Sequence, residues 1–160
     1  MGKCSTIENV EKFCSEQNIK LTTKRKKILM SLLNSEKALS AYELVKILKD
    51  KSGAAIPAMS VYRILDFLED NSLVHKLKLT NKYVACSHIS CDHKHGSSQF
   101  LICNDCDSVK EITVDQQTMT ALKSRVKSAG FSLRSLQLEM DCVCSKCDQI
   151  MKPDTMQKEL

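Results

Sequence analysis

Two Cys-x-x-Cys pairs combine the residue type and the spacing that metal binding needs. Cys103 and Cys106 form the first pair, and Cys144 and Cys147 form the second. Each pair presents two sulfurs from one tight turn, and four thiolates complete a tetrahedral zinc shell. Two redox-active dithiols are the alternative. Because two pairs close one shell, the sequence predicts a structural zinc site, in which Cys142 could replace Cys144.

A second group of metal-ligand residues lies upstream of the first pair. It consists of His75, Cys86, Cys91, His93 and His95. These side chains are more than one closed zinc site can use. The surplus predicts a second, separate metal site, and a chain with one closed and one separate site is typical of a metal sensor.

The composition favours a cytoplasmic protein with a packed core. Hydrophobic residues make up 42% of the 160 residues, and with four Phe, three Tyr and no Trp the predicted core is mostly aliphatic. No apolar run reaches the roughly 18 residues of a membrane span. The first residues, 1–6, lack the apolar region of a secretory signal. The nine cysteines are therefore expected to be metal-binding thiols in a reducing cytoplasm.

The excess of positive over negative charge lies entirely in the first half of the chain. Residues 1–80 carry 14 Lys and Arg against 9 Asp and Glu, whereas residues 81–160 carry 10 of each. A solvated lysine-rich helix face would explain the excess of +5. The sharper interpretation is an N-terminal domain that binds a polyanion, most simply nucleic acid.

Hydrophobic periodicity predicts helices in the first half, followed by a hairpin. The expected helices run from a capping box at Ser5 to about Gln17, over Leu21–Leu33, from a capping box at Ser40, and near Ser60–Asp70. The period then changes to two in Val74–Leu79 and Tyr83–Cys86. This order is typical of a winged helix-turn-helix, in which the second helix of the pair enters the major groove.

The second half reads as a small sheet with one helix. Strands are expected at Phe100–Cys103, Val109–Val114 and before the second Cys pair, with a helix over Met119–Ala129. Open edges of such a sheet favour pairing with a second chain, so a homodimer is predicted.

The predicted fold class is α+β, with a winged helix-turn-helix domain followed by a small α/β dimerisation domain that carries the Cys4 zinc site. The expected boundaries are 1–83 for the DNA-binding domain, 84–99 for a hinge and metal-binding linker, 100–148 for the dimerisation domain and 149–160 for a flexible tail.

Taken in order, these pieces resemble repressors of the ferric uptake regulator family, and the zinc uptake regulator branch in particular. The resemblance covers roughly Lys20 to Cys147. It rests on Ser40–Leu44, Ser60–Leu65, Asp66–Lys76, Tyr83–Cys86 and both Cys pairs. Two departures stand out. The linker motif reads Cys91–His95 with an extra cysteine, and Cys142 replaces the usual glycine.

The resemblance implies a regulatory zinc site made of His75, Cys86, His95 and Glu111. Cys91, His93 or His88 could substitute for His95. A thiolate in this set suits zinc better than iron. Without the resemblance, His75 and Glu111 would read as ordinary strand residues. Together with the Cys4 site, two Zn²⁺ ions per subunit are expected.

The resemblance also implies the DNA contacts. Tyr42 and Arg63 are the main candidates, and Arg63 could contact either a guanine or a phosphate. The weaker candidates, for phosphate contacts, are Lys24, Arg25, Lys26 and Lys27. An ordinary solvated arginine or an internal ion pair is the alternative for Arg63.

The function expected from this reading is a zinc-responsive transcriptional repressor, not an enzyme. It would bind double-stranded operator DNA as a zinc-loaded homodimer and control zinc-uptake genes, with no membrane partner and no small-molecule substrate. The first alternative is an iron- or peroxide-responsive regulator of the same family, against which Cys86 argues. A zinc enzyme lacks its signatures here, since neither H-E-x-x-H nor the deaminase pattern occurs. A zinc-stabilised adaptor would not explain the basic first half.

Overall fold

The chain divides into two compact units, Met1–Gly96 and Ser97–Leu160. The computed structural model describes residues 7–53, 55–89 and 98–151. Among the helices of these residues, none combines the length and the apolar character that crossing a membrane requires.

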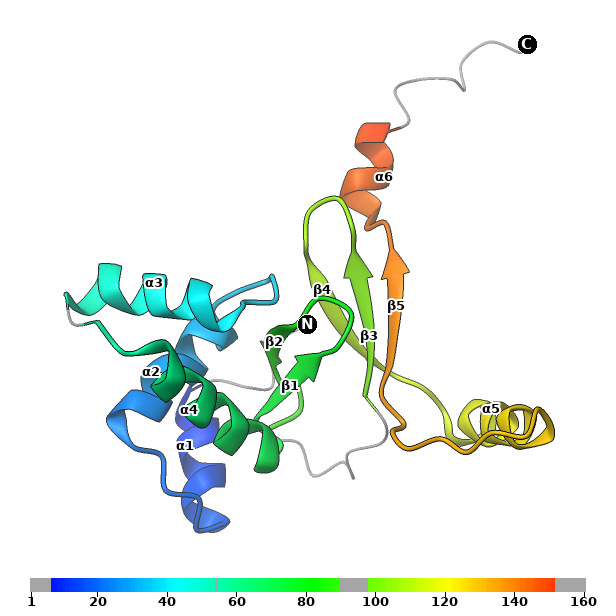
Figure 1. Ribbon diagram of the computed structural model, residues 1–160, viewed down its shortest axis with the longest axis horizontal. Helices are drawn as coiled ribbons and strands as arrows, with labels where there is room; N and C mark the ends of the chain where they lie inside the picture. Colours follow the sequence, from blue (N-terminus) through cyan, green and yellow to red (C-terminus); the bar gives the residue numbers. More distant parts are fainter. Residues whose placement is uncertain (1–6, 54, 90–97, 152–160) are drawn as a thin grey trace. The chain divides into compact units, whose positions relative to one another are not determined.

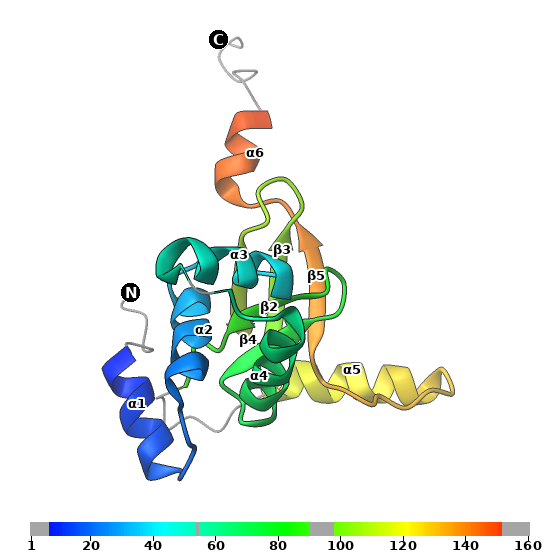
Figure 2. The ribbon, with the colours of Figure 1, turned by 60° about the vertical axis from the view of Figure 1, so that its left-hand side comes forward.

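Among its described residues, the first unit contains four helices (Figure 2) and a hairpin, as the sequence predicts. Its elements are α1 (Ile7–Glu16), α2 (Thr23–Leu33), α3 (Ala41–Ser52), α4 (Ala58–Asp70), β1 (Val74–Leu77) and β2 (Lys82–Ala85). The winged helix-turn-helix order is therefore confirmed.

Local capping chemistry sets the ends of these helices. The predicted capping box opens α3, because the Ser40 side chain accepts from Glu43 N–H and the Glu43 side chain accepts from Ser40 N–H. Gly53 ends α3 in the left-handed conformation, with φ of 66°. Helix α4 begins at Ala58, two residues before the predicted Ser60. Its N-cap residue is Pro57, which makes no side-chain capping hydrogen bond. The capping box predicted at Ser5 lies outside the described residues.

The core of the first unit is aliphatic, as expected. Its apolar positions include Ile28 and Leu29 from α2, Leu44 from α3 and Leu65 from α4, all fully buried. Burying a side chain of this size stabilises the fold by about 1.5–3 kcal/mol. Cys86 also belongs to this core, so the packed unit extends beyond residue 83, where the domain was predicted to end.

The hairpin is attached to the segment that leads into α3. Strands β1 and β2 pair antiparallel from Val74↔Ala85 to Leu77↔Lys82, and Asn81 in the turn has a φ of 52°. Lys82, which was predicted in the turn, is the first residue of β2. Leu39 and Tyr83 exchange two backbone hydrogen bonds of 2.9 and 2.8 Å, so the hairpin is held beside the start of α3.

The second unit is a three-stranded sheet of order β4-β3-β5 (Figure 1). Its elements are β3 (Ser98–Cys103), β4 (Val109–Thr113), α5 (Gln116–Ser128), β5 (Leu138–Cys142) and α6 (Ser145–Met151). Strand β3 pairs antiparallel with β4 and parallel with β5. Helix α5 lies in the connection from β4 to β5. Helix α5 begins three residues before the predicted Met119 because Asp115 caps it, accepting from Thr118 N–H at 2.8 Å.

A buried glutamine fixes where β5 enters the sheet. The fully buried Gln99 donates to the Leu136 carbonyl at 3.0 Å and accepts from Leu138 N–H at 2.7 Å. Neither this clamp nor α6 was predicted from the sequence. Residues 149–151, placed in a flexible tail, form the last turn of α6.

Candidate metal centres

The four cysteines of the two pairs meet at one end of the second unit. Cys103 ends β3, Cys106 lies in the following turn, Cys144 directly precedes α6, and Cys147 lies in the first turn of α6. Their sulfur atoms all lie within 4.8 Å of one another. The parallel pairing of β3 with β5 produces this meeting, since it sets Cys142 opposite Cys103 and brings Cys144 in two residues later.

The sulfur geometry fits zinc, and all four cysteines are free thiols. Cys106 Sγ and Cys144 Sγ are 3.7 Å apart. Zinc–sulfur bonds of about 2.3 Å give a tetrahedron with sulfur–sulfur edges of about 3.8 Å. A disulfide would need about 2.05 Å. The four cysteine sulfurs match the ligand set of a closed structural zinc shell, and the group that comes together includes Cys144 rather than Cys142.

Backbone donors favour thiolates in this cluster. The Cys144 N–H donates to Cys103 Sγ at 3.3 Å and is the largest cause of the pKa of Cys103 falling to about 6. The pKa of Cys144 is lowered in the same way by the Cys147 N–H. The pKa of Cys147 is raised, chiefly because its S–H is held by the Cys144 sulfur. In this arrangement a dication would displace the remaining protons, which is how zinc binding to thiols proceeds.

The first unit holds two residues of the predicted regulatory set. His75 lies in β1 opposite Val84, and Cys86 follows β2 directly. A ring nitrogen of His75 and the Cys86 sulfur lie within 4.8 Å of each other. Cys86 is fully buried, its N–H donates to the Leu73 carbonyl at 3.0 Å, and its sulfur accepts from His88 N–H at 3.4 Å. Cys86 was predicted in a linker and instead lies in the packed core.

Glu111 lies in the middle of β4 in the second unit. It is half-buried, pairs with Phe100, and accepts a 2.6 Å hydrogen bond from Ser98 Oγ. It is therefore not a simple solvated strand residue. The remaining candidates, Cys91, His93 and His95, lie outside the described residues.

The main DNA-contact candidates are exposed on two helices of the first unit. Tyr42 is 69% exposed in the first turn of α3, and Arg63 is exposed on α4. The rings of Tyr42 and Tyr62 meet edge to face, with centroids 6.4 Å apart. Lys24 is exposed in the first turn of α2. These side chains are accessible to a ligand on the helical unit.

Arg25 is engaged inside its own unit. Its guanidinium carbon lies 3.4 Å from the centroid of the Phe67 ring, and Nη1 donates to the Lys20 carbonyl at 2.7 Å. Lys26, its neighbour, pairs with Glu11 on α1. Arg25 therefore links α2 to α4, a role that the basic run in the sequence did not reveal.

Comparison with known proteins places this combination of units in a family. The sequence model of the ferric uptake regulator family matches residues 16–141. The chain belongs to the ferric uptake regulator family. It is 35% identical over 155 residues to the zinc uptake regulation protein of Escherichia coli (strain K12), a match covering 94% of this chain and 87% of that protein.

Two solved structures agree with this family assignment. A zinc uptake regulator complexed with zinc and DNA is 31% identical, with a TM-score of 0.76, and the match covers 90% of this chain and 93% of that chain. The crystal structure of holo XcZur is 36% identical, with a TM-score of 0.73, and the match covers 89% of this chain and 96% of that chain.

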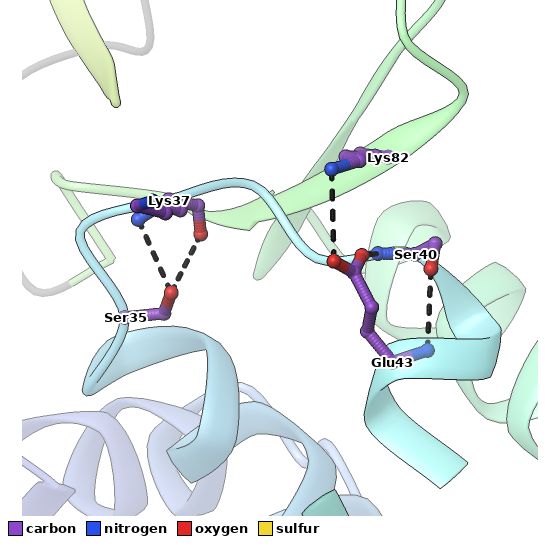
Figure 3. Close-up of polar contacts among 5 residues, drawn as sticks. All are labelled: Ser35, Lys37, Ser40, Glu43 and Lys82. Atoms are coloured by element: carbon purple, nitrogen blue, oxygen red, sulfur yellow. Dashed lines mark hydrogen bonds and ion pairs between the residues drawn. The ribbon is translucent and has the colours of Figure 1, made fainter. Parts of the chain in front are cut away.

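This family member also carries two sets of polar contacts before and at the start of α3, of which the sequence predicted only the capping box (Figure 3). Glu43 accepts from Ser40 N–H at 2.7 Å, and its other carboxylate oxygen lies 3.7 Å from Lys82 Nζ. Ser35, in the turn before α3, both donates to and accepts from the backbone of Lys37. The capping box was visible in the sequence, but Lys82 is distant along the chain. The contact between Glu43 and Lys82 joins the hairpin to the start of α3.

Proposed function

We propose that this chain is a zinc-responsive transcriptional repressor that binds double-stranded operator DNA and controls zinc-uptake genes. One observation carries the proposal. A thiol and an imidazole, Cys86 and His75, meet at the base of the hairpin in the helical unit that presents Tyr42 and Arg63. A metal bound there acts on the same packed unit that would contact DNA.

The regulatory zinc would be held by His75, Cys86, His95 and Glu111, with Cys91 or His93 as alternatives to His95. The fit of the described residues supports this set. Nitrogen and sulfur donors lie together on the first unit, and Glu111 offers a partly buried carboxylate on the second. A thiolate, an imidazole and a carboxylate suit zinc, and sulfur is a poor choice for an iron(II) site.

Coupling between zinc binding and DNA binding would follow from the division of the zinc ligands between the two units. His75 and Cys86 belong to the first unit and Glu111 belongs to the second. A zinc ion shared by them would restrict how the DNA-binding unit moves against the rest of the chain. Because the unit is already restricted, DNA binding costs less conformational entropy. The free energy saved is the coupling free energy between zinc and DNA. The second zinc, in the Cys4 site, would stabilise the fold and give two ions per subunit.

A homodimer would present two DNA-binding units to an operator with two half-sites. Support comes from the second unit. Among the described residues, β4 and β5 each have one edge without a paired strand. Phe131, Leu133 and Leu136, between α5 and β5, are exposed although they are apolar. Such edges and patches are typical of subunit interfaces. The cytoplasmic location goes with this proposal, since both thiol sites need a reducing compartment.

Metal-dependent gel shifts on the promoter regions of the organism's own zinc-transport genes test this function. The protein would be loaded with zinc, iron(II) or manganese(II) at controlled free-ion levels. Zinc should give specific retardation of one or more promoters, and the other two metals should not. Iron-specific retardation would support the alternative within the family, and no retardation with any metal would overturn the repressor function.

A further inference from the structure

The first turn of α4 presents a large apolar side chain to solvent. Met59 is 66% exposed, whereas the other apolar face of the same helix, Val61, Leu65 and Leu68, is fully buried. Met59 therefore lies outside the core cluster of its own unit. An exposed methionine at the start of a helix-turn-helix recognition helix lies where base edges are contacted.

Met59 shares a helix face with the arginine expected to reach the DNA. Arg63 is four residues later in α4, so the two side chains stand one turn apart on one face. Tyr62, three residues after Met59, continues the apolar surface toward Tyr42 through their edge-to-face contact. A groove that receives Arg63 would therefore also lie beside Met59.

The major groove presents one apolar group to a protein, the C5-methyl of thymine. The thioether chain of methionine is flexible and polarizable, and it adapts its shape to such a group. The neighbouring Arg63 supplies the positive charge that a DNA surface attracts. A protein partner would not require a guanidinium beside the apolar side chain.

We infer that Met59 is a specificity-determining residue that contacts the methyl group of one thymine in each operator half-site. The inference rests on the proposed function, because it needs an operator. The thymine would lie within about one or two base steps of the position that Arg63 contacts, because residues one helical turn apart reach neighbouring bases.

The experiment replaces each thymine of a half-site, one at a time, by deoxyuridine, which lacks only the C5-methyl group. Operator affinity is measured by fluorescence anisotropy with the zinc-loaded full chain. The operator affinity of wild type should fall about fourfold when deoxyuridine replaces thymine at one position, which is the loss expected when one methyl group leaves an apolar contact. Met59→Ala should bind the thymine and deoxyuridine operators equally at that position.

Leu79→Ala provides the matched control. Leu79 is another exposed apolar residue, 58% accessible at the tip of the hairpin, so its variant should keep the fourfold difference. Met59→Leu should keep most of the fourfold difference in affinity between the thymine and deoxyuridine operators. If wild type binds the operator but shows no deoxyuridine effect, or if Met59→Ala keeps it, the inference is overturned and the proposed function stands. If wild type does not bind the operator with zinc, both fall.

Discussion

Glu43 should stabilise the first unit through two separable interactions, and three substitutions distinguish them. Its carboxylate caps the start of α3 by accepting from Ser40 N–H, and it faces Lys82 on the hairpin at 3.7 Å. Glu43→Gln keeps an oxygen acceptor for the cap but removes the charge. Glu43→Ala removes both interactions. Lys82→Met removes the ion pair alone and keeps most of the side-chain packing.

The structure sets the magnitudes. Loss of a helix cap costs about 1 kcal/mol. The ion pair is worth about 0–1 kcal/mol, because the side chains of Glu43 and Lys82 remain 46% and 25% exposed and solvent screens the attraction. Glu43→Ala should therefore destabilise by about 1–2 kcal/mol, and the other two variants by about 0.5 kcal/mol each. In a unit of this size, 1 kcal/mol lowers Tm by about 4–8 °C.

Urea unfolding and thermal melts of the four proteins measure these differences. The pH dependence gives an independent check. The pKa of Glu43 is lowered from 4.5, first by the Ser40 N–H and less by Lys82. A lowered pKa means that this stabilisation is complete above the unfolded pKa and is lost as pH falls through the folded value. The gap in stability between wild type and Glu43→Gln should therefore shrink below about pH 4.5.

The reasoning about Glu43 would be refuted if Glu43→Gln lost as much stability as Glu43→Ala. The charge, and not the cap, would then dominate. If the stability of Glu43→Ala equalled that of wild type, neither interaction of Glu43 would contribute to the stability of the first unit.

Three further predictions concern the metal sites and the DNA face. Elemental analysis should find two zinc ions per fully loaded subunit, one of which survives mild chelation, and a single ion would contradict the two-site proposal. Cys103→Ser should lose the dimer or become insoluble in size-exclusion runs, because closed thiolate sites supply about 10 kcal/mol of folding energy in small zinc modules. A soluble, dimeric, zinc-responsive variant would refute a structural role. Arg63→Ala should weaken operator binding by about 1–3 kcal/mol in anisotropy titrations if it contacts a base, with relaxed specificity at one position. Equal weakening on all sequences would mean a phosphate contact, and unchanged affinity would exclude Arg63 from the interface.

Signals that are local in sequence predicted much of the fold. The capping box at Ser40 and the apolar spacing in α2 and α4 depend on residues within one or two turns, and the structure shows them. The meeting of the four cysteines was also predictable, because each Cys-x-x-Cys spacing already fixes half of the site.

What the sequence did not predict depends on partners distant along the chain. The stacking of Arg25 on Phe67 was not predicted, because Phe67 comes from another helix, and the phosphate contact of Arg25 stays a prediction. The burial of Cys86 follows from packing of the hairpin against the helices, and a polar neighbourhood in sequence suggested a linker instead. The assignment of the regulatory ligands came from family resemblance, since no spacing rule joins His75 to Glu111.

Zinc at the regulatory site should control DNA binding, and the decisive measurement is operator affinity as a function of free zinc. Wild type should bind more tightly as zinc rises, by the roughly 5–150-fold typical of allosteric coupling. Cys86→Ser and Glu111→Gln should remain folded and dimeric with the Cys4 zinc in place, yet keep the weak affinity of the zinc-poor wild type at every zinc level. If both variants retain the wild-type zinc response, these residues do not form the sensor, and zinc control of the repressor through them is contradicted.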